Sequence, residues 1–162
     1  MLDLLPDLFD LYPDKLQLLN LQLNNYGGKS IFYGQIETVR CFEDNSKVKQ
    51  VLATAGQGRI LVVDGEGSCK KALLGDLIAQ SAVDNGWAGV VIYGGVRDVG
   101  TIQTMDLGVK ASGAVPIKTE RRDQGAIGDA IVFGDVTVRS GMYLYADLNG
   151  VAVSNEALEV SI

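Results

Sequence analysis

The sequence of 162 residues contains no histidine. Histidine is the general base of Ser–His–Asp triads and a common zinc ligand. Its absence therefore excludes these triads, a histidine-ligated zinc site and a phosphohistidine carrier. Any acid–base chemistry must use carboxylates, lysine, tyrosine, cysteine or metal-bound water instead.

Cysteines and basic residues are also few. The two cysteines, Cys41 and Cys69, have no CxxC spacing and give no disulfide framework, which fits reduced thiols and predicts a cytoplasmic protein. The 14 Lys and Arg residues are outnumbered by 20 Asp and Glu residues, so the formal net charge is -6. Because such a charge repels phosphate backbones, we expect no direct binding of nucleic acid.

Long hydrophobic runs are missing as well. No segment approaches the roughly 20 apolar residues of a membrane span, so we expect no membrane partner. The acidic N-terminal stretch MLDLLPDLFD lacks the basic region of a signal peptide. The length predicts one domain over residues 1–162, and the share of hydrophobic residues, 47%, is ordinary for a soluble globular protein.

The stretch from Gly75 to Asp98 is the most informative part of the sequence. Between Gly75 and Gly86 the apolar residues recur at helical spacing, and Asp76 suits the positive first turn of a helix with Gly75 at its N-cap. Residues 88–93, AGVVIY, are almost without polar side chains, which predicts a strand that is buried on both faces.

A candidate binding site follows this strand, where Arg97 and Asp98 come shortly after a double glycine. The free N–H groups at the start of the preceding helix attract anions, and the planar guanidinium of Arg97 matches a carboxylate. The carboxylate of Asp98 can hold a hard divalent cation such as Mg²⁺ or Mn²⁺. On physical grounds alone, an exposed ion pair on a loop explains the two residues equally well.

The rest of the chain alternates between helical and strand patterns separated by turn residues. Helices are predicted over residues 2–11, 47–55 and 101–105, and strands over residues 30–42, 59–64, 109–112, 130–139 and 142–153, with a turn at Asn149-Gly150. These patterns indicate an α/β fold with a β-rich second half.

Four segments are less regular. Residues 15–24 fit an extended or a helical segment, and the charged, glycine-broken residues 116–128 predict a surface loop. The glycine-rich residues 65–68 are interpreted as a tight connection, because the GK[ST] ending of a P-loop is missing. The polar tail, residues 154–162, predicts an edge segment or a partly ordered end.

Several motifs together resemble the RraA family, the regulators of ribonuclease E activity, whose superfamily also contains the class II 4-hydroxy-4-methyl-2-oxoglutarate (HMG) aldolases. The resemblance covers nearly the whole chain. The motifs are CFEDN at residues 41–45, LVVDGEGS at 61–68, GDLIAQSAVDNGWAGVVIYGGVRD at 75–98 and YADLNG at 145–150.

This resemblance implies a swivelling β/β/α domain, an α/β fold of mixed sheets with covering helices, which assembles into a homotrimeric ring or two stacked rings. It implies that Asp98 binds the divalent cation. It also implies a set of substrate-binding residues at the helix start and after the strand, namely Gly75, Asp76, Leu77, Ile78 and Arg97.

For function, the resemblance implies divalent-metal-dependent cleavage of HMG to two pyruvates, with Arg97 and Asp98 as catalytic residues and Mg²⁺ or Mn²⁺ as cofactor. Oxaloacetate decarboxylation passes through the same pyruvate enolate, so one site that binds small 2-oxo acids can serve both reactions. Because histidine is absent, two candidates stay open for the base that removes the C4-hydroxyl proton: metal-bound water and a carboxylate from a neighbouring subunit.

Thr101 departs from the pattern of the aldolases, which carry an acidic residue three positions after the aspartate. A hydroxyl cannot orient or deprotonate water as a carboxylate can, so this departure predicts a weaker metal site. Two other functions therefore stay open. One is a non-catalytic protein regulator that binds and inhibits ribonuclease E, for which an acidic surface suits an arginine-rich partner; the other is an inert oligomeric domain with a vestigial site.

Overall fold

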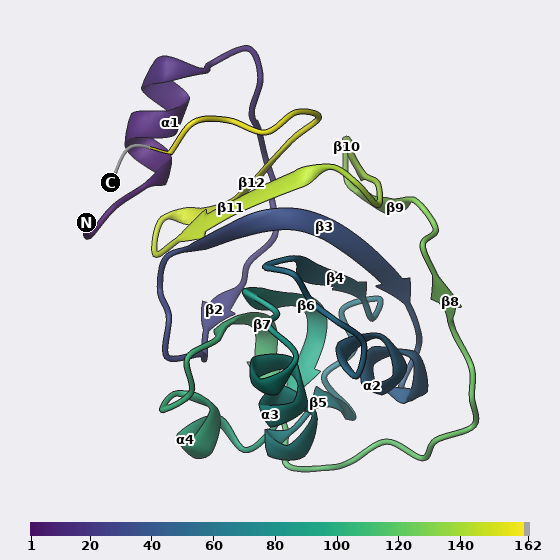
Figure 1. Cartoon of the computed structure of the whole chain (residues 1–162). Coiled ribbons are helices and arrows are strands. Elements are labelled where there is room, and N and C mark those ends of the chain that lie inside the picture. Colours follow the sequence, from purple (N-terminus) through teal and green to yellow (C-terminus); the bar gives the residue numbers. More distant parts are fainter. Residues whose placement is uncertain (161–162) are drawn as a thin grey trace.

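The computed structural model describes residues 1–160 of the chain, which form a large mixed sheet with helices packed on it (Figure 1). The helices are α1 (Leu5–Leu11), α2 (Ser46–Leu52), α3 (Asp76–Asp84) and α4 (Val99–Ile102). The strands are β1 (Gln17–Leu18), β2 (Asn24–Asn25), β3 (Phe32–Arg40), β4 (Ile60–Asp64), β5 (Ala72–Leu74), β6 (Gly89–Val96), β7 (Gly108–Ala114), β8 (Ala126–Ile127), β9 (Ile131–Phe133), β10 (Val136–Val138), β11 (Tyr143–Asp147) and β12 (Gly150–Ser154). No helix among residues 1–160 is long and apolar enough to cross a membrane.

The centre of the molecule is a parallel arrangement of β3, β4, β6 and β7, with β5 added beside β6. Strands β4 and β6 are buried along nearly their whole length, as their apolar sequences predict. Helices α2 and α3 cover one face of this layer, where Leu52 and Ala82 belong to the same core as Leu61 and Ile92. The carboxyl ends of the parallel strands thus meet the first turns of both helices.

The opposite face of the parallel layer packs against antiparallel strands. Strand β3 pairs with β11 through residues 32–35 and with β4 through residues 36–40, so it joins the two parts of the sheet. The strands β10 and β11 contribute Val138 and Leu144 to a second core, which they share with Val62 of β4.

The N-terminal helix α1 packs beside β11 and β12 (Figure 1). The backbone N–H groups of Leu4 and Leu5 each donate a 2.8 Å hydrogen bond to the buried carboxylate of Asp147, at the end of β11. The N-terminal segment is thereby fastened to one end of the sheet.

The predicted α/β class, with a mixed sheet and covering helices, is confirmed, and so are most of the predicted elements. The helix predicted from Gly75 and the strand predicted over residues 88–93 are α3 and β6. Residues 15–24 are extended rather than helical where they form β1 and enter β2. Helix α2 ends at Leu52 rather than at residue 55, because the chain already turns at residues 53–54.

Three predicted boundaries are wrong. The expected single strand over residues 130–139 is a hairpin of β9 and β10, because Gly134 adopts a φ of +63° and the chain reverses there. Helix α4 begins directly after Asp98 rather than at residue 101. Asp147 pairs with Gly150, so the turn between β11 and β12 lies at residues 148–149 rather than at Asn149-Gly150.

A long connection, residues 116–125, is called the strap below. It leaves β7, passes the carboxyl ends of the parallel strands and leads to β8, which pairs with β3 (green in Figure 1). The predicted surface loop over residues 116–128 is therefore confirmed for most of the strap, while residues 126–127 form a strand instead. In the predicted tail, residue 154 ends β12, residues 155–160 form no strand, and residues 161–162 lie outside the described part of the chain.

Candidate active site

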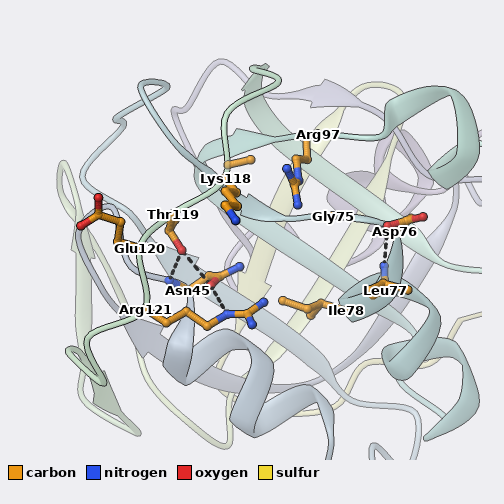
Figure 2. A pocket seen from close by; sticks show the side chains of 11 residues that line it. Asn45, Gly75, Asp76, Leu77, Ile78, Arg97, Lys118, Thr119, Glu120 and Arg121 are labelled. Atoms are coloured by element: carbon orange, nitrogen blue, oxygen red, sulfur yellow. Dashed lines mark hydrogen bonds between the residues drawn. The ribbon is translucent and has the colours of Figure 1, made fainter.

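A pocket of about 590 Å³ lies where the parallel strands end and α3 begins (Figure 2). Its lining comes from the start of α3 (residues 75–78), Arg97 after β6, residues 118–121 of the strap, and Asn45 before α2. The pocket therefore gathers side chains from segments that are far apart in the sequence, at the edge of an α/β sheet where ligands commonly bind.

Gly75 allows Arg97 and Asp98 to approach the start of α3. A Cβ atom built on Gly75 would lie 2.9 Å from Oδ2 of Asp98 and 3.2 Å from Nε of Arg97. Real Cβ atoms essentially never approach another atom as closely as 2.9 Å, and a contact of 3.2 Å is tight, so a side chain at this position would displace the two charged groups. The glycine that the sequence suggests as an N-cap thus also makes room for the candidate catalytic pair.

Asp98 lies beside the pocket rather than in its lining. Among residues 1–160, those that line the pocket include Arg97 but not Asp98. The backbone of Asp98 is left-handed, with φ 57° and ψ 36°, a conformation that aspartate tolerates better than most residues. Its Oδ2 atom lies 3.8 Å from Nε of Arg97, and the side chains of Asp98 and Arg97 are 36% and 37% exposed. The exposed ion pair that the sequence allowed as an alternative explanation is therefore present.

The first N–H groups of α3 are engaged with carboxylates. The N–H of Asp76 donates a 2.9 Å hydrogen bond to Oδ2 of Asp98, and the N–H of Leu77 donates one of 2.9 Å to Oδ1 of Asp76 itself. These two contacts agree with the preference of a helix N-terminus for negative groups. They also mean that Asp98 and any bound substrate would both use backbone N–H groups at the start of α3.

The donor atoms at this edge suit a magnesium or manganese ion. Asp98 uses Oδ2 for its hydrogen bond and ion pair, which leaves Oδ1 for a cation. Residues 1–160 contain no cluster of three His, Cys, Asp or Glu side chains that could enclose a metal. An ion held through the Asp98 carboxylate would therefore keep water or substrate oxygens at its other positions, as Mg²⁺ usually does.

No pattern in the sequence predicted that the strap forms a wall of the pocket. Thr119 donates a 2.9 Å hydrogen bond from its hydroxyl to Oδ1 of Asn45, and Nε of Arg121 donates one of 3.1 Å to the same oxygen (Figure 2). The cationic run KTERR was visible in the sequence, but only the fold brings Lys118 and Arg121 to the same pocket as Arg97.

Asp44 fastens the strap to the start of α2. Its side chain is buried and accepts hydrogen bonds from the hydroxyl and N–H of Ser46, at 2.6 and 2.9 Å, and from the N–H groups of Arg122 and Gln124, at 2.7 and 3.2 Å. Burial favours a higher pKa for this carboxyl group, but the hydrogen bonds outweigh it and lower the pKa from 3.8 to about 2. Asp44 is therefore ionised at neutral pH and holds the strap in place.

Thr101 lies in α4, one helical turn beyond Asp98. Its side chain is exposed, and its backbone N–H donates a 3.0 Å hydrogen bond to the carbonyl of Asp98. A residue at this position is thus close to the backbone of Asp98, whose carboxylate the resemblance assigns to the metal.

Known proteins match this chain over nearly its whole length. The RraA-like family, described as aldolase/RraA, matches residues 5–153. A protein of Shewanella oneidensis named "Putative 4-hydroxy-4-methyl-2-oxoglutarate aldolase" is 60% identical over 158 residues, which cover 98% of this chain and 96% of the relative. A protein of Vibrio cholerae with the same name is 52% identical over 161 residues, which cover 99% of this chain and 100% of the relative.

Solved structures share the fold. A Geobacillus kaustophilus protein described as an S-adenosylmethionine: 2-dimethylmenaquinone methyltransferase superposes with a TM-score of 0.93 at 45% identity, covering 95% of this chain and 96% of that chain. The RNA-processing inhibitor RraA from Thermus thermophilis superposes with a TM-score of 0.93 at 37% identity, covering 98% of this chain and 96% of that chain. With the family match over residues 5–153 and these full-length relatives, the chain belongs to the RraA-like family.

Proposed function

We propose that this protein is a divalent-metal-dependent aldolase that cleaves HMG to two pyruvates and also decarboxylates oxaloacetate. The observation that carries the proposal is the shared pocket of Arg97 and residues 75–78, with the Asp98 carboxylate hydrogen-bonded to the first N–H of α3. The names of the two relatives that are 60% and 52% identical support the same reaction. We further propose that residues 1–162 form one RraA-like domain and that the working unit is a homotrimer.

The residues of the pocket have distinct tasks in this reaction. A Mg²⁺ or Mn²⁺ ion at Asp98 supplies Lewis-acid chemistry at the 2-oxo group when it is bound. The start of α3, residues 75–78, orients the adjacent C1 carboxylate of the substrate with its N–H groups. The guanidinium of Arg97 stabilises the negative charge that develops on the enolate oxygen of the pyruvate formed from C1 to C3.

Cleavage breaks the C3–C4 bond of HMG and moves the proton of the C4 hydroxyl to a base. The electron pair of the broken bond enters the enolate that Arg97 stabilises, and the C4 carbon becomes the ketone of the second pyruvate. A proton added to C3 of the enolate, which replaces the one lost from the C4 hydroxyl, completes the first pyruvate. A carboxylate of a neighbouring subunit in the homotrimer is the protein group that we assign to the base. Loss of CO₂ from oxaloacetate leaves the same enolate, so it uses the same Arg97 contact without that base.

Pyruvate release tests the proposal. We expect the wild type with Mg²⁺ or Mn²⁺ to release pyruvate from HMG and from oxaloacetate, to lose this activity in EDTA, and to regain it when the metal is restored. Asp98→Ala should lower the rate by about 100-fold or more, because the metal loses its carboxylate. Asp135→Ala, at an exposed aspartate in the β9–β10 turn, is the matched control and should leave the rate unchanged. Equal rates with and without EDTA, at the uncatalysed background, would refute the proposal.

A second candidate function is regulation of ribonuclease E by direct binding. The observation that favours it is the structure of an RNA-processing inhibitor at 37% identity and a TM-score of 0.93. The net charge of -6 suits an arginine-rich partner segment. A pull-down with the non-catalytic region of the ribonuclease should then recover a complex that weakens as salt is raised, and no complex at low salt would remove this function. The two functions are compatible, because a family fold can carry both.

A further inference from the structure

Three cationic side chains converge on the pocket. Figure 2 shows Arg97 and Lys118 pointing into the same space from one side and Arg121 reaching into it from the opposite wall. Among residues 1–160, no carboxylate lies within 4.0 Å of Lys118 or Arg121. The carboxylate of Glu120 is paired with Arg122 at 2.7 Å and points away from the pocket, so it leaves the two cations of the strap available to a ligand (Figure 2).

Backbone contacts place Lys118, and a side-chain hydrogen bond places Arg121. The N–H of Ala72 donates a 2.7 Å hydrogen bond to the carbonyl of Ile117, which sets Lys118 beside the start of β5. Arg121 is held by its 3.1 Å hydrogen bond to Asn45, and only its Nε is used, so its terminal nitrogens face the pocket. The backbone of the strap is therefore anchored beside the pocket, and the Arg121 side chain needs little ordering when it binds a ligand.

The positive charges of the pocket suit a ligand with two carboxylates. The start of α3 and Arg97 lie where the proposed function places the C1 carboxylate and the 2-oxo group. Lys118, on the same side as Arg97, and Arg121, on the opposite wall, add donors from the strap that suit a second carboxylate. HMG carries its second carboxylate at C5, which stays on the pyruvate that leaves with the C4 carbon.

We infer that Lys118 and Arg121 bind the distal carboxylate of the substrate and make the site selective for 2-oxo dicarboxylic acids over 2-oxo monocarboxylic acids. The identity of the substrate rests on the proposed function. The selectivity does not require turnover, so it is tested separately from the aldolase reaction.

The test compares two acids that differ only at the distal end. 2-Oxoglutarate has the five-carbon chain and both carboxylates, while 2-oxopentanoate lacks the second carboxylate, and neither carries the C4 hydroxyl that cleavage needs. Titration calorimetry in Mg²⁺ should show that the wild type binds 2-oxoglutarate at least about tenfold more tightly. Lys118→Met and Arg121→Met should each remove most of this preference and leave the affinity for 2-oxopentanoate within about twofold.

Two control variants make the same change of charge outside the pocket. Lys49→Met, on the exposed side of α2, and Arg139→Met, after β10, should keep the wild-type preference. Arg121→Lys should keep part of it, because the charge remains while the guanidinium fork is lost. All the substituted residues are exposed, so the melting curves of these variants should stay close to that of the wild type.

The inference is overturned if the wild type binds both acids equally, or if Lys118→Met and Arg121→Met weaken both acids to the same degree. The aldolase proposal is judged on a separate measurement, pyruvate release from HMG by the wild type. A wild type that prefers 2-oxoglutarate but releases no pyruvate would refute the aldolase and support the dicarboxylate selectivity of the strap.

Discussion

The carboxylate of Asp98 accepts a 2.9 Å hydrogen bond from the backbone N–H of Asp76. This contact ties the end of β6 to the first turn of α3. The N-cap residue of α3, Gly75, has no side chain to cap the helix, so Asp98 takes over that task from another element. The residue proposed to bind the metal therefore also positions the helix start proposed to bind the substrate.

Gly75→Ala tests how closely the side chains of Arg97 and Asp98 must approach the start of α3. The new methyl group would lie 2.9 Å from Oδ2 of Asp98 and 3.2 Å from Nε of Arg97, while the φ of -129° is open to alanine. We expect the fold to persist and pyruvate release from HMG to fall by about tenfold or more, because both charged groups are displaced. Gly100→Ala is the control, since an added Cβ there meets no atom within 4 Å. Unchanged activity in Gly75→Ala would mean that the pair can shift without loss.

Thr101→Asp tests the departure from the aldolase pattern. Thr101 lies one turn beyond Asp98 in α4 and is exposed, so a carboxylate placed there adds negative charge next to the proposed metal ligand. We expect the variant to bind Mn²⁺ several-fold more tightly, by about three- to tenfold, in a titration followed by electron paramagnetic resonance. Thr104→Asp, one further turn along the chain and also exposed, adds the same charge as a control. Equal gains in the two variants would show a general effect of charge rather than a second ligand.

The part of the site that could be predicted from sequence is the part built from local patterns. The helix after Gly75, the buried strand β6 and the pair Arg97 and Asp98 all lie within one continuous stretch, so spacing and composition were enough to place them. The hydrogen bond from Asp76 to Asp98 was not foreseen, because it depends on the left-handed backbone at Asp98.

The strap was predicted as a loop, but its position as a wall of the pocket was missed for a different reason. Its residues follow neither a helical nor a strand period, and the contact that places it, from Ala72 to Ile117, joins distant parts of the chain. A charged segment of this kind has the same composition whether it lines a pocket or lies free in solvent. The hairpin around Gly134 was missed because one glycine within an apolar run fits a strand with a bulge as well as a turn.

Asp44→Asn tests the fastening of the strap through its pH dependence. The folded-state pKa of Asp44, about 2, lies below the ordinary value of 3.8. The ionised group therefore stabilises the fold above about pH 4, and this stability is lost as the pH falls towards 2. At pH 7 we expect the variant to be less stable by about 1–2 kcal/mol in urea unfolding, because hydrogen bonds to a buried charge are weakened.

The same variant carries a second expectation. The stability difference between wild type and Asp44→Asn should shrink at pH 3, since part of the wild-type contribution is already lost there. Because the strap is loosened, the preference for 2-oxoglutarate over 2-oxopentanoate should also decrease. Asp135→Asn, at an exposed position, should show neither effect. A constant difference between pH 7 and pH 3 would contradict the role of the Asp44 charge.

Lys110→Met tests a charge that is buried away from the pocket. Lys110 lies in β7 and is only 3% exposed, and among residues 1–160 no carboxylate lies within 4.0 Å of its ammonium group. Burial lowers the pKa of Lys110 below 10.5, an effect that the charge of Asp147 partly opposes. The folded state thus disfavours the proton, so wild-type stability carries a penalty at neutral pH that disappears as the pH rises towards 10.5.

We therefore expect Lys110→Met to be more stable than the wild type at pH 7, by about 1 kcal/mol, because methionine fills a similar volume without a charge to desolvate. The difference should narrow at pH 10, where the wild-type lysine begins to lose its proton in both states. Urea unfolding at the two pH values measures both effects, with Lys49→Met on exposed α2 as the control. A variant that is less stable at pH 7 would show that attraction to Asp147 exceeds the cost of burial, and Lys110 would then be a stabilising charge within the sheet.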